Sequence, residues 1–201
     1  RGACVLYELY AAELTAGGWQ AGSGAIFNLG SHALRDDGWT SADAAGLPIL
    51  PGLARYDEVA AGAIRHALRV TTPCTAAAYV WPARHQAVPD DCPASAPAGA
   101  RFPPMGLRLR LKASFDISGF SHDTRVLLLA MQRYGLLVAD NGSAWYVSGA
   151  PDEGWVDDTL VDELEQVHGS DFEVVDTSSL MIDPDSGQAR QVNASLPAAA
   201  Y

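Results

Sequence analysis

Hydrophobic and polar residues alternate with a period of two in several segments of this chain. In the clearest segment, 105–116 ("MGLRLRLKASFD"), every second side chain is apolar. The apolar set is Leu107, Leu109, Leu111, Ala113 and Phe115, and the polar set is Arg108, Arg110, Lys112, Ser114 and Asp116. This alternation predicts a strand with one buried face.

Further segments are typical of strands. They are "ACVLYELY", "GSGAIFNL", "HALRVTT", "AAYVWPA" and "DFEVVDTSSLMI", with Gly17 and Gly18 near a turn between the first two. In "LLVADNGSAWYVSG", apolar runs flank Asn141-Gly142. That dipeptide accepts positive φ at both central positions of a type I′ turn, so it predicts a β-hairpin.

Helical patterns interrupt the strands. Segment 121–135 has Ser121 as a possible N-cap and Gly135 as a C′ residue, with apolar residues around more than one stripe. Segment 157–169 carries apolar residues on one face. A third, short helix is predicted within 55–64.

The pattern as a whole favours a mainly β fold, either a sandwich or jelly-roll or a strongly curved sheet, with two or three peripheral α-helices. An α+β fold is the alternative. We expect a single β-rich domain over 1–183 and a wrapping segment or tail over 184–201. The chain begins within a strand and without an initiator Met, so we expect it to be the C-terminal part of a longer chain. The N-terminal part of that precursor is then an expected binding partner of this part.

Composition narrows the function classes. The chain has 201 residues and a formal net charge of −11, from 24 acidic against 13 basic residues. Such a charge disfavours nucleic acid and anionic membranes as partners. Cys74 and Cys92 flank a proline-containing excursion that suits a disulfide, with unrelated thiols as the alternative. A disulfide and few lysines favour a secreted, extracytoplasmic protein.

Candidate catalytic residues cluster in the first half of the chain. Asp43 stands alone among apolar and small residues in "WTSADAAGLPILPG", and "RYDEVAAGAIRHALRV" contains Asp57, Glu58 and His66. If Asp43 and Glu58 or Asp57 face one cleft, they can act as acid and base in glycoside hydrolysis. A turn cap for Asp43 and surface ion pairs for the others are the structural alternatives.

Candidate substrate-binding residues lie further along. The segment "YVWPARH" offers an aromatic platform and an imidazole in Tyr79, Trp81, Arg84 and His85. The row Arg108, Arg110 and Lys112 suits an acidic polymer, and Trp145 suits a sugar face, although a solvated sheet face and core packing explain these residues equally well.

Cofactor and nucleophile signatures are missing from the sequence. The histidines lack H-x-x-x-H or H-x-H spacing, so we expect no metal and no other cofactor. A metal site of Asp43, His66 and His85 is the minority alternative. No G-x-S-x-G elbow occurs, which ranks acyl transfer low.

Six blocks of the sequence carry a resemblance. They are "GWTSADAAGLPILPGLARYDEV", "IRHALRV", "YVWPARH", "MGLRLRLKASFDISGFS", "YGLLVADNGSAWYVSGAPDEGW" and "GSDFEVVD". Together they resemble a group of large, secreted bacterial and fungal proteins of uncharacterised activity. The resemblance implies export and a longer parent chain, and no activity. The shared blocks contain Asp43, Asp57, Glu58, His66, His85, Arg108, Arg110, Lys112 and Asp140. His32, His122 and His168 stand where other residues are expected.

The leading hypothesis is a secreted carbohydrate-active enzyme that cleaves a polysaccharide or another glycan. Hydrolysis uses Asp43 with Glu58 or Asp57, and His66 or His85 assists. One alternative is a polysaccharide lyase, in which Tyr79 or His85 abstracts a proton and the Arg108 row neutralises a uronate. Another is a noncatalytic glycan-binding or structural module, in which Trp81 and Trp145 stack on sugar.

Overall fold

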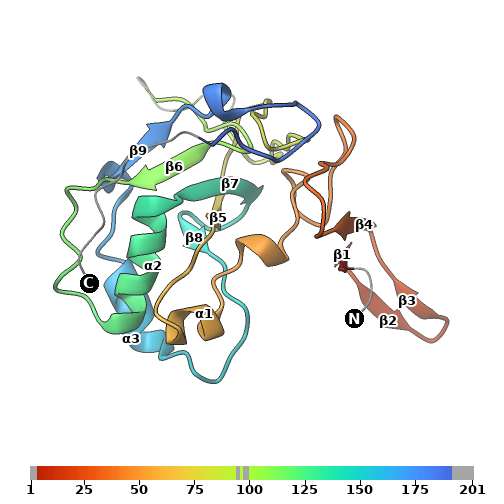
Figure 1. Ribbon diagram of the computed structural model, residues 1–201. Coiled ribbons are helices and arrows are strands. Elements are labelled where there is room, and N and C mark those ends of the chain that lie inside the picture. The colour runs from red at the N-terminus through yellow and green to blue at the C-terminus, as the bar shows by residue number, and fades with distance from the viewer. Residues whose placement is uncertain (1–3, 94–95, 97–99, 192–201) are drawn as a thin grey trace.

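The computed structural model describes residues 4–93, 96 and 100–191, and the fold is mainly β, as the sequence pattern predicts. A five-stranded sheet with the order β8-β5-β7-β6-β9 curls into a half-barrel (Figure 1). Its strands are β5 (Leu68–Thr72), β6 (Arg108–Leu111), β7 (Leu136–Asn141), β8 (Tyr146–Val147) and β9 (Phe172–Val175). Strands β5 and β7 are parallel and all other neighbours are antiparallel. The strongly curved sheet is therefore the form of the prediction that the structure confirms.

Three α-helices accompany the sheet: α1 (Tyr56–Ala60), α2 (His122–Arg133) and α3 (Asp157–Leu164). Short 3-10 turns are η1 (Leu50–Gly52), η2 (Gly169–Asp171) and η3 (Ser178–Leu180). Helix α2 lies against β6, with α1 and α3 packed beside it (Figure 1). It ends as predicted, since Gly135 follows it with a φ of 79°. Only glycine adopts that left-handed conformation without strain.

The core lies between α2 and the sheet. It contains side chains without exposed surface from both elements, including Leu68, Leu111 and Leu128. Each such side chain contributes about 1.5–3 kcal/mol of burial free energy. The alternation in 105–116 thus reports a real buried face, because Leu111 is fully buried and Arg110 is exposed.

The N-terminal residues form an arm that projects from this body (Figure 1). Strands β1 (Val5–Tyr10) and β4 (Ser23–Asn28) pair antiparallel, and β2 (Glu13–Thr15) and β3 (Gly18–Gln20) form the hairpin at its tip. Phe27 of β4 is buried, and the Arg35 guanidinium lies 6.0 Å from the centroid of its ring. The Glu8 carboxylate accepts the Ile49 N–H at 2.9 and 3.0 Å and the Leu50 N–H at 3.0 Å, which anchors the arm.

The predicted hairpin at Asn141-Gly142 is wrong. Strand β5 lies between β7 and β8, so the two flanks of that turn do not pair with each other. Val70 of β5 faces Val138 on one side and Val147 on the other. An apolar strand placed centrally has partners for its backbone groups on both edges, and this tertiary advantage outweighs the local turn preference.

The predicted strand in "AAYVWPA" is also wrong. Among the described residues it contributes one isolated bridge, between Tyr79 and Met105. Pro82 cannot donate to a ladder hydrogen bond, which ends the pairing.

The disulfide prediction is confirmed, because Cys74 and Cys92 are bonded with 5.7 Å between their Cα atoms. Cys4 is a free, exposed cysteine. From the expected C-terminal segment, residues 184–186 accept hydrogen bonds from Trp81 and Arg84, and residues 192–201 lie outside the described residues. No helix in the described part of the chain has the length and apolar character needed to cross a membrane.

Candidate functional site

Asp43 lies in a buried loop rather than at the surface. The segment 41–47 has no helix or strand, yet Asp43 is only 1% exposed. Backbone groups of the loop are hydrogen-bonded to a side chain of the same loop. Ser41 Oγ accepts the Asp43 N–H at 2.9 Å and donates to the Leu47 carbonyl at 2.7 Å. The Ala45 N–H donates to the Ala139 carbonyl of β7 at 2.8 Å. These bonds hold Asp43 beside the sheet.

The Asp43 carboxylate binds Arg69 of β5 with two hydrogen bonds. Arg69 Nη2 donates to Oδ1 at 2.7 Å and Nε donates to Oδ2 at 3.2 Å. Arg69 Nη1 also donates to Ser148 Oγ at 2.5 Å. Among the described residues this carboxylate accepts no backbone N–H, so it does not act as the turn cap that we considered. A paired arginine fork of this kind fixes the orientation of a carboxylate.

A β-bulge brings a second carboxylate to the same place. Strands β5 and β7 pair Arg69 with Leu137 and Val70 with Val138, and then the register shifts so that Thr71 faces Asp140. Directly paired residues share a face of the sheet, so the extra residue, Ala139, moves Asp140 onto the face of Arg69. Asp140 Oδ2 lies 3.8 Å from Arg69 Nη2.

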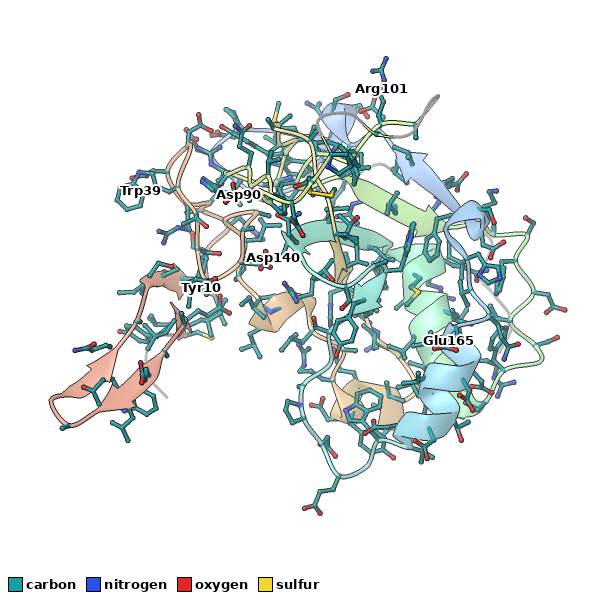
Figure 2. The ribbon with its side chains drawn as sticks, turned by 180° about the vertical axis from the view of Figure 1, so that it is seen from behind. Tyr10, Trp39, Asp90, Arg101, Asp140 and Glu165 are labelled. Atoms are coloured by element: carbon teal, nitrogen blue, oxygen red, sulfur yellow. A yellow bond between two sulfur atoms is a disulfide. The ribbon has the colours of Figure 1, made fainter. Side chains whose placement is uncertain are left out.

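Asp140 lies at the C-terminal end of β7, on the side of the sheet that faces the N-terminal third of the chain (Figure 2). The pKa of Asp43 is raised from 3.8 to about 7, mainly because burial disfavours the charged form; the ion pair with Arg69 opposes this shift, and the neighbouring Asp140 carboxylate contributes to it. A carboxyl group with a pKa of about 7 carries its proton in about half of the molecules at neutral pH. Asp43 and Asp140 therefore form a carboxyl pair that can donate a proton.

A cleft of about 220 Å³ is lined in part by Asp43 and Arg69. Its lining is mostly apolar and includes Asp43, Arg69, His66, Leu47, Pro48 and Leu137. Perturbed ionisable groups at the edge of an apolar cleft are a common mark of a functional site.

His66 connects this cleft to Glu58. The Nε2 atom of His66 lies 3.0 Å from Glu58 Oε2, and its Nδ1 lies 2.9 Å from the Ala67 carbonyl oxygen. Arg55 Nη2 lies 2.7 Å from Glu58 Oε1. Asp57 has a side chain that is 81% exposed and lies 4.0 Å from Arg55. The structure thus brings His66, with Glu58 bound to it, to the cleft of Asp43, and leaves Asp57 in solvent.

The residues of "YVWPARH" are engaged elsewhere. His85 Nδ1 lies 2.9 Å from the Ala44 carbonyl oxygen, and the Tyr79 hydroxyl donates to Asp37 Oδ1 at 2.8 Å. Trp81 Nε1 donates to the Ser186 carbonyl at 2.8 Å. Arg84 donates to the Arg35 and Pro184 carbonyls and to Asp185, at 2.6 to 2.7 Å. Trp81 and Arg84 thus hold residues 184–186 rather than forming an open platform.

The expected basic row on β6 is not a set of free cations. Arg108 is largely buried, which lowers its pKa, and it donates to the Tyr134 carbonyl. Arg110 pairs with Glu173 of β9 at 2.6 Å, and Lys112 Nζ donates to the Ser170 carbonyl at 2.6 Å. Trp145 stacks on Phe172 with 5.1 Å between ring centroids. Strand β9 and its N-terminal flank supply the partners of Arg110, Lys112 and Trp145, and the end of α2 supplies that of Arg108. Alternation within β6 does not reveal any of these partners.

Within the described ranges, no three His, Cys, Asp or Glu side chains are grouped so as to hold a metal ion. Sequence reasoning missed Arg69, Ser148 and the role of Asp140. Arg69 carried one signal, because it is the charged residue within the apolar strand segment "HALRV".

Comparison of the chain with protein-family models, with curated proteins and with solved structures gave no match in any of the three.

Proposed function

We propose that this chain is a secreted carbohydrate-active enzyme that hydrolyses glycosidic bonds at the Asp43 cleft. The observation that carries the proposal is the buried Asp43, whose pKa is about 7, beside Asp140 and Arg69 at the edge of this cleft. A carboxylic acid that remains partly protonated at neutral pH is what a general acid requires. The disulfide and the net charge of −11 agree with an extracytoplasmic location.

We assign the acid role to the Asp43–Asp140 pair and the base role to His66 and Glu58. Asp43 donates its proton to the glycosidic oxygen as the bond to the anomeric carbon breaks. Asp43 Oδ1 and Asp140 Oδ2 lie 2.7 and 3.8 Å from the same atom, Arg69 Nη2, so the two carboxyl groups are neighbours on one cation rather than an acid and a base on opposite sides of a glycosidic bond. Asp43 and Asp140 therefore act as one proton-donating unit, and Glu58, through His66, takes the proton of the attacking water.

The test is a screen for new reducing ends on a panel of neutral and acidic polysaccharides. Asp43→Asn and Asp140→Asn are expected to lower kcat by about 100-fold or more, the usual contribution of a positioned acid or base. Asp57→Asn is the matched control, because its side chain is 81% exposed. Hydrolysis that survives both changes, or no hydrolysis of any glycan, overturns the proposal.

A pH profile separates a catalytic role from a structural one. Activity should fall as the pH rises through about 7, because Asp43 then loses its proton. In Asp140→Asn the like charge is gone, so this loss should move to lower pH. A purely structural Asp140 would leave the position of that limb unchanged.

A noncatalytic glycan-binding module is the second candidate. It is favoured by the exposed Trp19 and Trp39, which are 69% and 58% exposed. The lyase alternative has less support, because Arg110 and Lys112 already have protein partners.

A further inference from the structure

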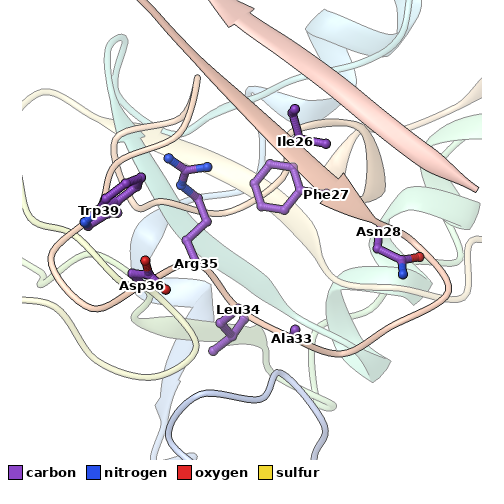
Figure 3. A pocket seen from close by; sticks show the side chains of 8 residues that line it. All are labelled: Ile26, Phe27, Asn28, Ala33, Leu34, Arg35, Asp36 and Trp39. Atoms are coloured by element: carbon purple, nitrogen blue, oxygen red, sulfur yellow. The ribbon is translucent and has the colours of Figure 1, made fainter.

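A second pocket lies where the N-terminal arm meets the body (Figure 3). It has a volume of about 230 Å³. Strand β4 and the following loop form its walls, and the lining includes Phe27, Asn28, Arg35, Asp36 and Trp39. None of these residues belongs to the Asp43 cleft.

Arg35 occupies an unusual position in this pocket. Its guanidinium lies between two aromatic rings, with its central carbon 5.5 Å from the centroid of Trp39 and 6.0 Å from that of Phe27 (Figure 3). The Nε atom is buried and has no hydrogen-bond partner among the described residues. The rings support the cation from its sides and leave its N–H groups for an acceptor that the protein itself does not provide.

Arg108 Nε is also buried without a partner, but Arg108 Nη1 donates to a carbonyl, whereas no guanidinium nitrogen of Arg35 has an acceptor among the described residues. In the described part of the chain, the arginines that are at least half-buried otherwise have carboxylate or carbonyl acceptors, as Arg69, Arg84 and Arg108 do. Those without a side-chain acceptor, Arg65, Arg101, Arg125, Arg133 and Arg190, are exposed to solvent. A partly desolvated arginine without an anion is costly unless a ligand supplies one.

The other groups in the pocket suit a sugar ring. Trp39 is 58% exposed and presents an aromatic surface beside the guanidinium. Asn28 Oδ1 accepts the Gly30 N–H at 3.0 Å, which leaves its amide N–H groups for a ligand. The Asp36 carboxylate can accept hydrogen bonds from hydroxyl groups. It also repels a doubly charged anion such as phosphate, so a ligand with one negative charge and several hydroxyls fits best.

We propose that this pocket binds a uronic acid residue of a glycan, with the carboxylate on Arg35 and the ring against Trp39. The proposal names the substrate class and rests on the proposed function, although binding here can be measured without catalysis. The planar guanidinium fork matches a carboxylate, which makes Arg35 the specificity determinant for an acidic over a neutral glycan.

The experiment is calorimetric titration of the protein with trigalacturonate and with its neutral counterpart, galactotriose. Trigalacturonate should bind, and Arg35→Gln should weaken its binding by about tenfold or more, since hydrogen bonds to charged groups are lost. Galactotriose should bind wild type about tenfold more weakly than trigalacturonate, and Arg35→Gln should not change its binding. Arg65→Gln removes an exposed arginine without an acceptor and should leave the affinity for both sugars unchanged.

Two further variants keep the outcome clear. Trp39→Ala should weaken both sugars, and Arg35→Lys should recover only part of the affinity, because a lysine has no fork. No binding of trigalacturonate, equal binding of both sugars, or binding unaffected by Arg35→Gln overturns the inference. Asp140→Asn should lower the rate of hydrolysis by about 100-fold and leave binding intact, so failure of the catalytic proposal and failure of this one give different results.

Discussion

The raised pKa of Asp43 makes the stability of the protein depend on pH in a way that one substitution removes. The pKa rises from 3.8 to about 7, so the protonated form is favoured in the folded state. The stability associated with this group is fully present below the unfolded-state pKa. It is lost as the pH rises through the folded-state pKa.

The size of the effect follows from the shift. Each pKa unit corresponds to about 1.4 kcal/mol, so Asp43 lowers the free energy of unfolding by about 4 kcal/mol between roughly pH 3.5 and pH 7.5. Asp43→Asn keeps the shape of the side chain and does not titrate. The free energy of unfolding of the variant, relative to wild type, should therefore rise by about 4 kcal/mol over that interval.

Urea denaturation of both proteins at several pH values in this range is the assay. Subtracting the two curves cancels the groups that titrate equally in both proteins. Asp57→Asn serves as the control and should give a flat difference, because that side chain is 81% exposed. A difference between Asp43→Asn and wild type that stays constant with pH would show that Arg69 keeps Asp43 ionised throughout, and would refute the reasoning.

Three other perturbations test the fold. Leu128→Ala removes a side chain with no exposed surface and should cost about 2–5 kcal/mol in urea unfolding, whereas a loss under about 1 kcal/mol would mean that the core is not packed as described. Replacing Cys74 and Cys92 together by Ser opens a loop of 18 residues and should cost about 3 kcal/mol, and an unchanged urea midpoint would contradict this. Gly46 has a φ of 73°, and Gly46→Ala places a methyl group 2.5 Å from a backbone carbonyl oxygen. The change should therefore lower the melting temperature more than Gly62→Ala, because Gly62 has a similar φ of 82° but open space around the added methyl group. Equal losses in the two variants would argue against this loop conformation.

Much of the fold could be predicted because it depends on local patterns. The strand around Leu109 and the helix between Ser121 and Gly135 depend on residues that are close together in the sequence, and both match the structure. The Asn141-Gly142 hairpin failed for the opposite reason. Its flanking strands have a stronger partner in β5, which is distant in sequence.

The candidate site shows the same division. Asp43 was conspicuous as a lone carboxylate in a segment of small and apolar residues, and the structure places it beside a cleft. The carboxyl group that lies beside Asp43 is Asp140, whereas Asp57 is exposed to solvent. Asp140 reaches this place through a register shift between β5 and β7, which no property of either strand taken alone reveals.

The sequence by itself determined the β-rich class, the disulfide, the acidic surface and the position of α2, because periodicity, spacing and charge are properties of the chain. Only the tertiary structure decided which side chains are free to act. Arg108, Arg110 and Lys112 look like an open basic row and are engaged by groups that lie far away in sequence. Arg35 attracted no attention in the sequence; its buried Nε lacks an acceptor, as Arg108 Nε does, but unlike Arg108 it has no other guanidinium hydrogen bond among the described residues. Hydrogen bonding and desolvation depend on three-dimensional neighbours, and these set the chemistry of a side chain more strongly than its place in a motif.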